Sequence, residues 1–250
     1  MSYAVLGREF YGWLGGSTGG SPVIYHYGYP AFGGLEPNVS AQWLFAEGSG
    51  NIVDQVAAIT VTKVGTPTYS VSASGSFSGL SPGITFGAGN YFKTAGDDVA
   101  LDIGTNDFTF EFWGKTSSSS DQLIYDGTAA GVLGMWIDIE TSGTFAYSAH
   151  FEAEDTTTVN VHIGLAAGFA DGNIHKMRWK GIRTGNVEVI MDGVSQGTAS
   201  IAALSGKTIL NHGKGIGVWN AGNNINWLGT MYEMRLSLNS SNNSGGPSGG

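Results

Sequence analysis

The stretch DFTFEFWGK, Asp107–Lys115, decides the fold class of this 250-residue chain. Bulky apolar side chains recur at every second position, which is typical of a β-strand whose successive side chains point to opposite faces. Both of the resulting sets contain aromatic residues, so this segment predicts a strand with large apolar side chains to bury. The two sets are Phe108, Phe110 and Phe112, and Thr109, Glu111 and Trp113.

Further segments show the same period. NVEVIMDG, residues 186–193, alternates apolar and polar residues and ends in Asp192–Gly193, which predicts a two-residue hairpin turn. WLGTMYEMRLSL, residues 227–238, is another such run. Helical spacing with caps does not extend over more than about two turns anywhere. Many short strands separated by turn signals predict an all-β fold, an antiparallel sandwich or jelly roll.

Composition divides the chain into three zones. Residues 1–38 are rich in Gly and aromatic residues and show no sustained period, so we expect an irregular N-terminal extension. Residues 39–238 read as strand after strand and are long enough to bury one sizeable core. Residues 239–250, NSSNNSGGPSGG, form a low-complexity tail that cannot bury apolar surface.

The charge pattern excludes several classes of function. Charged residues make up 12% of the chain, against a usual fraction of about 25%. The net charge is −9, and the 11 Lys and Arg residues form no cluster along the sequence, which disfavours nucleic acid. The absence of Cys removes disulfides and thiolate metal sites. The first residues do not read as a secretory signal, and no apolar run is long enough to predict a membrane span.

The N-terminal extension carries more aromatic residues than a solvated linker needs. Flexible Gly-rich backbone with aromatic anchors is typical of an arm that becomes ordered when it docks on a partner. The alternative is that the extension packs on its own domain. The candidate docking residues are Phe10, Tyr11, Trp13, Tyr25, Tyr27, Tyr29 and Phe32.

Four segments resemble, in order and spacing, the laminin-G-like, concanavalin A-like jelly-roll family. The resemblance covers about 200 residues and implies two curved antiparallel sheets, with ligand sites on a sheet face or in rim loops. One departure is Ile174, where the family often has Trp before the His. Because this fold carries lectins, hydrolases, adhesins and virion proteins, the resemblance implies no single function. The segments are AQWLFAEGSGNIVDQ (41–55), FTFEFWGK (108–115), DGNIHKMRWKGIRTGNVEVIMDGVSQG (171–197) and WLGTMYEMRLSL (227–238).

Residues 135–163 predict a three-stranded meander. The strands MWIDIE, TFAYSAHFEAE and VNVHI each alternate apolar and polar residues. A three-residue turn, Thr141–Gly143, and a five-residue loop, Glu154–Thr158, keep the apolar sets on one face. In this register His150 lies opposite His162, and Glu152 lies opposite Asn160. The other face then carries Trp136, Asp138, Ser148, His150, Glu152, Asn160 and His162, which are the candidate glycan-binding residues.

MWIDIE also resembles part of the Glu-x-Asp-x-Glu motif of laminarinase-type hydrolases. Asp138 and Glu140 match two of the three carboxylates, but Trp136 stands where the nucleophile would be. Since retaining hydrolysis needs a pair of suitably placed carboxylates, we expect no enzyme activity. The same residues suit binding, with Trp136 stacking on a sugar ring. Two alternatives stay open: an ordinary solvated sheet face, and a metal site at His150, His162 and Glu152.

We expect no cofactor, with calcium as the alternative. By resemblance to the family, loop carboxylates would supply the oxygen ligands that calcium takes, but no calcium-loop spacing occurs. The candidate ligands are Asp97, Asp98, Asp126 and Asp171. His175 is expected to be a buried, hydrogen-bonded residue at a strand entry, and four Trp residues are expected in the core: Trp43, Trp113, Trp179 and Trp227.

These features together favour a non-enzymatic jelly-roll module on a particle or cell surface. The specific hypothesis is a bacteriophage virion protein, a capsid decoration or fibre component that docks through its N-terminal arm. Such a protein is expected to be a homo-oligomer. The alternative is a bacterial extracellular carbohydrate-binding domain or adhesin.

Overall fold

A computed structural model describes residues 3–6, 9–12, 38–73, 80, 82–93, 101–128, 134–142, 145–154, 158–165, 168–211, 215–218 and 225–238. The chain divides into two compact units, Met1–Pro37 and Asn38–Gly250. Each unit is described by itself.

The first unit contains two short strands. β1 (Tyr3–Leu6) and β2 (Glu9–Gly12) pair antiparallel, with Tyr3 opposite Gly12 and Leu6 opposite Glu9. These eight residues of the predicted extension therefore form a pair of strands, which their apolar and aromatic residues favour. Phe10 and Tyr11 belong to β2. The other predicted docking residues lie outside the described residues: Trp13, Tyr25, Tyr27, Tyr29 and Phe32.

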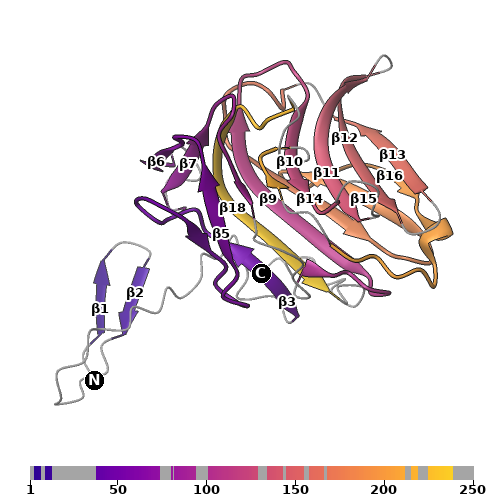
Figure 1. The fold of residues 1–250 in the computed structure, drawn as a ribbon, viewed down its shortest axis with the longest axis horizontal. Helices are drawn as coiled ribbons and strands as arrows, with labels where there is room; N and C mark the ends of the chain where they lie inside the picture. Colours follow the sequence, from indigo (N-terminus) through magenta and orange to yellow (C-terminus); the bar gives the residue numbers. More distant parts are fainter. Residues whose placement is uncertain are drawn as a thin grey trace. The chain divides into compact units, whose positions relative to one another are not determined.

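The second unit is built from two antiparallel sheets, which confirms the predicted all-β sandwich (Figure 1). In the described residues the first sheet has the order β13-β12-β11-β10-β17-β8-β5-β4. Its strands, in chain order, are β4 (Ile52–Val53), β5 (Thr60–Val64), β8 (Tyr91–Lys93), β10 (Gln122–Asp126), β11 (Met135–Ser142), β12 (Phe145–Glu154), β13 (Thr158–Gly164) and β17 (Gly215–Ile216).

The second sheet has the order β16-β15-β14-β9-β18-β7-β6 in the described part of the chain, and β3 also pairs with β18. The long strands β9 and β18 run side by side at its centre (Figure 1). Its strands are β3 (Val39–Trp43), β6 (Thr68–Val71), β7 (Gly83–Phe86), β9 (Phe108–Thr116), β14 (His175–Gly181), β15 (Asn186–Met191), β16 (Val194–Ser200) and β18 (Gly229–Leu238). A short 3-10 helix, η4 (Ala202–Leu204), follows β16.

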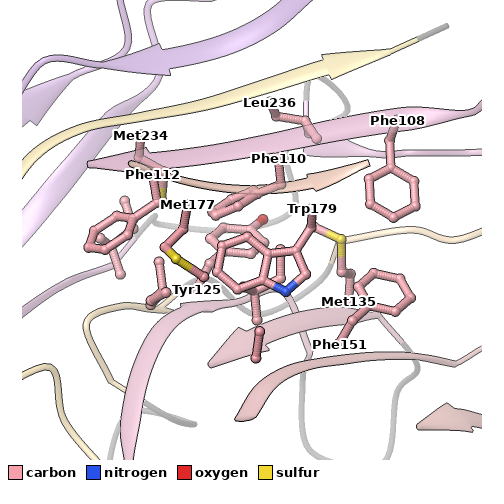
Figure 2. Packing of buried hydrophobic residues seen from close by; sticks show 14 of the residues in the cluster. Phe108, Phe110, Phe112, Tyr125, Met135, Phe151, Met177, Trp179, Met234 and Leu236 are labelled. Carbon is pink, nitrogen blue, oxygen red and sulfur yellow. The ribbon is translucent and has the colours of Figure 1, made fainter. Parts of the chain in front are cut away.

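Aromatic side chains of β9 join the two sheets. Phe108 stacks on Phe151 of β12, with ring centroids 5.3 Å apart. Phe110 contacts Tyr125 of β10 at 5.7 Å and Trp179 of β14 at 6.0 Å. Figure 2 shows these rings in the space between the two sheets, where removal of apolar surface from water stabilises the sandwich.

The Asp192–Gly193 hairpin is confirmed. Met191 pairs directly with Val194, so the connection between β15 and β16 has two residues. Both turn residues have positive φ, 51° at Asp192 and 83° at Gly193. This is the backbone that a type I′ turn requires, and it explains why the Asp-Gly sequence occurs here.

Three of the four predicted core Trp residues, Trp43, Trp179 and Trp227, lie in the core. The prediction for Trp113 is wrong in one respect. Trp113 is fully buried, but it alternates with the phenylalanines of β9 and therefore lies on the sheet face away from the core. Among the described residues, no helix is long and apolar enough to cross a membrane.

Candidate functional site

The predicted meander is confirmed. Strands β11, β12 and β13 run side by side (Figure 1), and Asp138, His150 and His162 lie in one row across them. A second row joins Trp136, Glu152 and Asn160. The apolar residues of the three strands, among them Ile137 and Phe151, pack into the core. The opposite side of β11–β13 is called the meander face here; it carries Trp136, Asp138, Glu140, Ser148, His150, Glu152, Asn160 and His162.

Both connections of the meander are shorter than predicted. Ser142 pairs with Phe145, and Glu154 pairs with Thr158, so each strand continues further before the chain turns. At the first turn, the pairing of β11 with β12 is irregular between Glu140 and Ser142. There, both the backbone N–H and the hydroxyl of Thr141 donate to Asp121 Oδ1, each at 2.9 Å. Asp121 directly precedes β10, so these hydrogen bonds tie β11 to its neighbour on the side away from β12.

The candidate residues differ in their access to solvent. Asn160 and His162 are exposed and Trp136 is half-buried. Asp138 and Ser148 are 5% and 0% exposed, so they lie beneath the surface. The side chains of His150 and Glu152 lie outside the described part of the structure. A ligand on the meander face therefore has Trp136, Asn160 and His162 as its accessible described contacts among the predicted residues.

A pair of ionisable side chains crosses the meander face. His162 Nδ1 of β13 lies 3.5 Å from Glu140 Oε2 of β11, and both side chains are partly exposed. Glu140 is in register with Ser148, the residue of the intervening strand. A small side chain at this position leaves room for the pair to approach across β12. Glu140 was part of the hydrolase comparison but was not among the predicted binding residues.

The arrangement is suited to binding rather than to glycoside cleavage. Retaining hydrolysis requires a carboxylate nucleophile and a carboxyl acid on either side of the glycosidic bond. The indole of Trp136 stands where the motif has its nucleophile and has no carboxylate to attack with. An indole that shares a sheet face with amide, imidazole and carboxylate groups can instead stack on a sugar ring, while those groups bond to sugar hydroxyls.

The structure places two of the four calcium candidates. Asp126 Oδ1 accepts hydrogen bonds from the N–H and the hydroxyl of Thr128, at 2.8 and 2.6 Å. Asp171 accepts from Asn173 and contacts His175. Both carboxylates therefore have turn-forming roles. Asp97 and Asp98 lie outside the described residues. In the described part of the chain, no three His, Cys, Asp or Glu side chains are grouped to hold a metal ion.

His175 connects a loop to a hairpin, and its predicted burial and hydrogen bonding are confirmed. It is 9% exposed at the start of β14. Its Nδ1 lies 2.6 Å from Asp192 Oδ2, and its Nε2 lies 3.1 Å from Asp171 Oδ1. The hydrogen bond to Asp192 raises the pKa of His175, against the effect of burial and together with Asp171. The protonated ring can donate to both carboxylates at once.

This geometry predicts a loss of stability above neutral pH. Because the folded-state pKa of His175 is raised from 6.5, its contribution is fully present below about pH 6.5 and is lost as pH rises through the folded pKa. Thermal unfolding followed by circular dichroism from pH 5.5 to 9 should show the midpoint falling over this range. The fall should be shallower in His175→Gln, and equal slopes for the two proteins would contradict this role.

A second cluster of polar residues lies on the other sheet. Glu111 of β9 is 1% exposed on the side away from the core. Its Oε1 contacts Lys176 Nζ at 2.8 Å and Arg178 Nη2 at 2.7 Å. Arg235 of β18 binds the other oxygen through its guanidinium, with Nε at 2.9 Å. One carboxylate is thus held by three cations from two strands, β14 and β18.

The three cations determine the ionisation of Glu111. Burial raises its pKa, but Arg235, Lys176 and Arg178 together outweigh burial and lower the pKa to about 2. Nearby, burial raises the pKa of Glu233, against its hydrogen bond from Gln42 and the attraction of Arg235. Burial lowers the pKa of Lys176, against the attraction of Glu111. This surface therefore combines a firmly ionised carboxylate with several cations.

Sequence reasoning missed this cluster. The 11 Lys and Arg residues are dispersed along the chain, but pairing of β14 with β9 and of β9 with β18 brings several of them together. The available signal was a charged residue at the polar positions of three predicted strands, in TFEFW, HKMRWK and YEMRL. Trp113 lies among them, with Lys176 Nζ 4.6 Å and Arg235 Cζ 5.7 Å from its ring centroid.

The two antiparallel sheets of the second unit form a jelly-roll sandwich, and similar solved structures share this fold. One is domain 4 of AbnA, a GH43 extracellular arabinanase from Geobacillus stearothermophilus, in complex with arabinotriose. It has a TM-score of 0.55 and 13% identity, over 80% of this chain and 92% of that chain. At this identity the likeness shows the fold alone.

Two toxin domains are similar to the same extent. The binding domain of Paraclostridial Mosquitocidal Protein 1 has a TM-score of 0.57 and 11% identity, over 80% of this chain and 48% of that chain. The botulinum neurotoxin serotype D binding domain has a TM-score of 0.56 and 10% identity, over 80% and 47%. The chain thus spans about half the length of these toxin domains. No protein-family model matches the sequence, and a search of curated protein sequences found no match.

Proposed function

We propose that this protein is a non-catalytic glycan-binding domain and that the meander face is its binding surface. The observation that carries the proposal is the half-buried Trp136 on the same sheet face as the exposed Asn160, in one cross-strand row with it, and as the His162–Glu140 pair. A fixed, partly exposed indole offers a flat apolar surface for the C–H face of a sugar. The neighbouring amide, imidazole and carboxylate donate to and accept from sugar hydroxyls.

The comparisons support the same class of function. The jelly-roll domain of the arabinanase was solved with a trisaccharide, and the two toxin domains are described as binding domains. The rigid sheet beneath the meander face adds to this support. A site on paired strands is held more firmly than one on loops, so less conformational freedom is lost when a ligand binds.

Replacement of Trp136 is expected to weaken glycan binding strongly. A glycan array probed with the wild-type protein should identify neutral oligosaccharides that bind, and Trp136→Ala should weaken that binding by about 30-fold, as for a Trp at the centre of an interface. Tyr91→Ala is the matched control, because Tyr91 is a half-buried aromatic residue of β8 in the same sheet. Indistinguishable array profiles for wild type and Trp136→Ala would remove the meander face as the site.

The array is complemented by an assay that separates binding from hydrolysis. Incubation with a panel of β-glucans should release no reducing sugar. Release that disappears in Asp138→Asn or Glu140→Gln would identify a hydrolase and overturn the non-catalytic assignment.

We further propose an extracellular or particle-surface location, with the virion protein as the specific hypothesis and a bacterial extracellular module as the alternative. The support for the virion hypothesis is compositional: few charges, no Cys, and an aromatic, Gly-rich extension before the jelly roll. In this hypothesis the extension docks on a capsid or tail protein, and the domain is a homo-oligomer. Limited proteolysis tests the docking role, because rapid removal of residues 1–38 from the isolated protein supports partner-dependent ordering and full protection contradicts it.

A further inference from the structure

The charged sheet face around Glu111 has a formal charge opposite to that of the rest of the protein. This face is called the cationic face here; it is the side of β9, β14, β15 and β18 away from the core. Alternation along these strands places eight charged residues on it: Lys115, Lys176, Arg178, Lys180, Arg235, Glu111, Glu188 and Glu233.

The charge asymmetry is large for so acidic a chain. Five of the 11 Lys and Arg residues and three of the 20 Asp and Glu residues lie on the cationic face, which gives it a formal charge of +2. The remaining six basic and 17 acidic residues carry −11. An anionic ligand is therefore repelled by most of the protein surface and attracted to this face.

The cations at the edge of the cluster are accessible. Arg178 and Lys176 have side chains 33% and 20% exposed, whereas the Arg235 side chain is 3% exposed. Arg178 uses Nε and Nη2 to bind Glu111, which fixes the guanidinium plane and leaves its Nη1 group for a second acceptor. Lys180, half-buried, follows Arg178 on the same face of β14.

We propose that the cationic face is a second glycan-binding surface, which takes a carboxylated sugar of an acidic polysaccharide. The sugar carboxylate lies against Arg178 with Lys180 and Lys176 on either side. A planar guanidinium that is already oriented by Glu111 is suited to a planar carboxylate. This surface is separate from Trp136, so the two binding proposals succeed or fail independently.

Two features favour a short acidic glycan over a nucleic acid. Glu111, Glu188 and Glu233 lie among the cations, and the charge of −11 outside the face opposes any long polyanion that extends beyond it. A short acidic oligosaccharide with one carboxylate against Arg178 needs only the patch formed by Lys176, Arg178 and Lys180 on β14.

The proposal is tested by titrating the full-length protein with oligogalacturonate, and with a neutral glucan and single-stranded DNA of similar length. We expect oligogalacturonate to bind more tightly than DNA and, unlike the neutral glucan, to bind more weakly in 0.5 M than in 0.1 M salt. Arg178→Gln should weaken binding by about 10-fold or more, as expected for a lost charge-assisted hydrogen bond.

Lys180→Glu is a second variant, needed in case the loss of Arg178 disturbs the fold. Lys180 is not one of the three cations that bind Glu111, so its substitution leaves that buried network in place. It should also weaken binding by about 10-fold. Lys93→Glu is the matched control, an exposed strand Lys in the other sheet. It should bind oligogalacturonate as the wild type does. Tighter binding of DNA, or no effect of either cationic-face substitution on oligogalacturonate binding, would overturn the proposal.

Discussion

Glu111→Gln is expected to lower the free energy of unfolding by about 3–5 kcal/mol, the usual cost of removing one partner of a buried ion pair. The substitution keeps the size of the side chain but leaves Lys176, Arg178 and Arg235 without their shared carboxylate. Arg235 is 3% exposed and cannot recover its hydration. Urea unfolding followed by tryptophan fluorescence measures the loss directly.

Glu188→Gln is the matched control. Glu188 is a half-buried residue of β15 on the same sheet face, so its substitution should cost less than about 1 kcal/mol.

Acidification provides a second check on the role of Glu111. The folded-state pKa of Glu111 is lowered from 4.5 to about 2, so its stabilisation is present above pH 4.5 and is lost as pH falls towards 2. As pH falls from 4.5 towards 2, the wild type should lose the free energy of unfolding that Glu111 contributes. Glu111→Gln, which lacks this carboxylate, should not show that loss. Equal costs for the two glutamine variants at pH 7 would show that the network does not stabilise the fold.

Phe110→Ala is expected to destabilise the protein by about 3–5 kcal/mol, because it opens a cavity between the two sheets. Phe110 is 1% exposed and contacts Tyr125 of the opposite sheet and Trp179 of its own sheet (Figure 2). Thermal and urea unfolding should agree on the size of the effect. Phe110→Leu fills most of the cavity and should cost clearly less. A loss below about 1 kcal/mol for Phe110→Ala would mean that the sheets do not depend on this contact.

The sequence was sufficient to predict the sandwich and the register of the meander. Strand periodicity fixes which face each side chain takes, and short turns restrict how neighbouring strands can pair. The rows Asp138–His150–His162 and Trp136–Glu152–Asn160 follow from these two rules. The length of the first turn was mispredicted, because the pairing of Ser142 with Phe145 follows a register irregularity that simple alternation does not contain.

Other features of the two faces depend on contacts between distant segments. Alternation predicts that Ser148 points away from the core, but its complete burial also depends on what lies over it. The gathering of Lys176, Arg178 and Arg235 around Glu111 depends on the order of strands in the sheet, which single-strand patterns do not contain. For the same reason, dispersed cations in a sequence do not exclude a cationic surface.

The central claim is that Trp136 on the meander face binds a glycan. The measurement that tests it most directly is a ¹H–¹⁵N spectrum of the seven Trp indoles, recorded during titration with the oligosaccharide that binds best on the array. The resonance that is absent in Trp136→Ala should shift progressively and saturate, while those of the buried Trp43, Trp179 and Trp227 stay in place. A saturating ligand that leaves the Trp136 resonance unmoved, or shifts other indoles instead, would contradict the account.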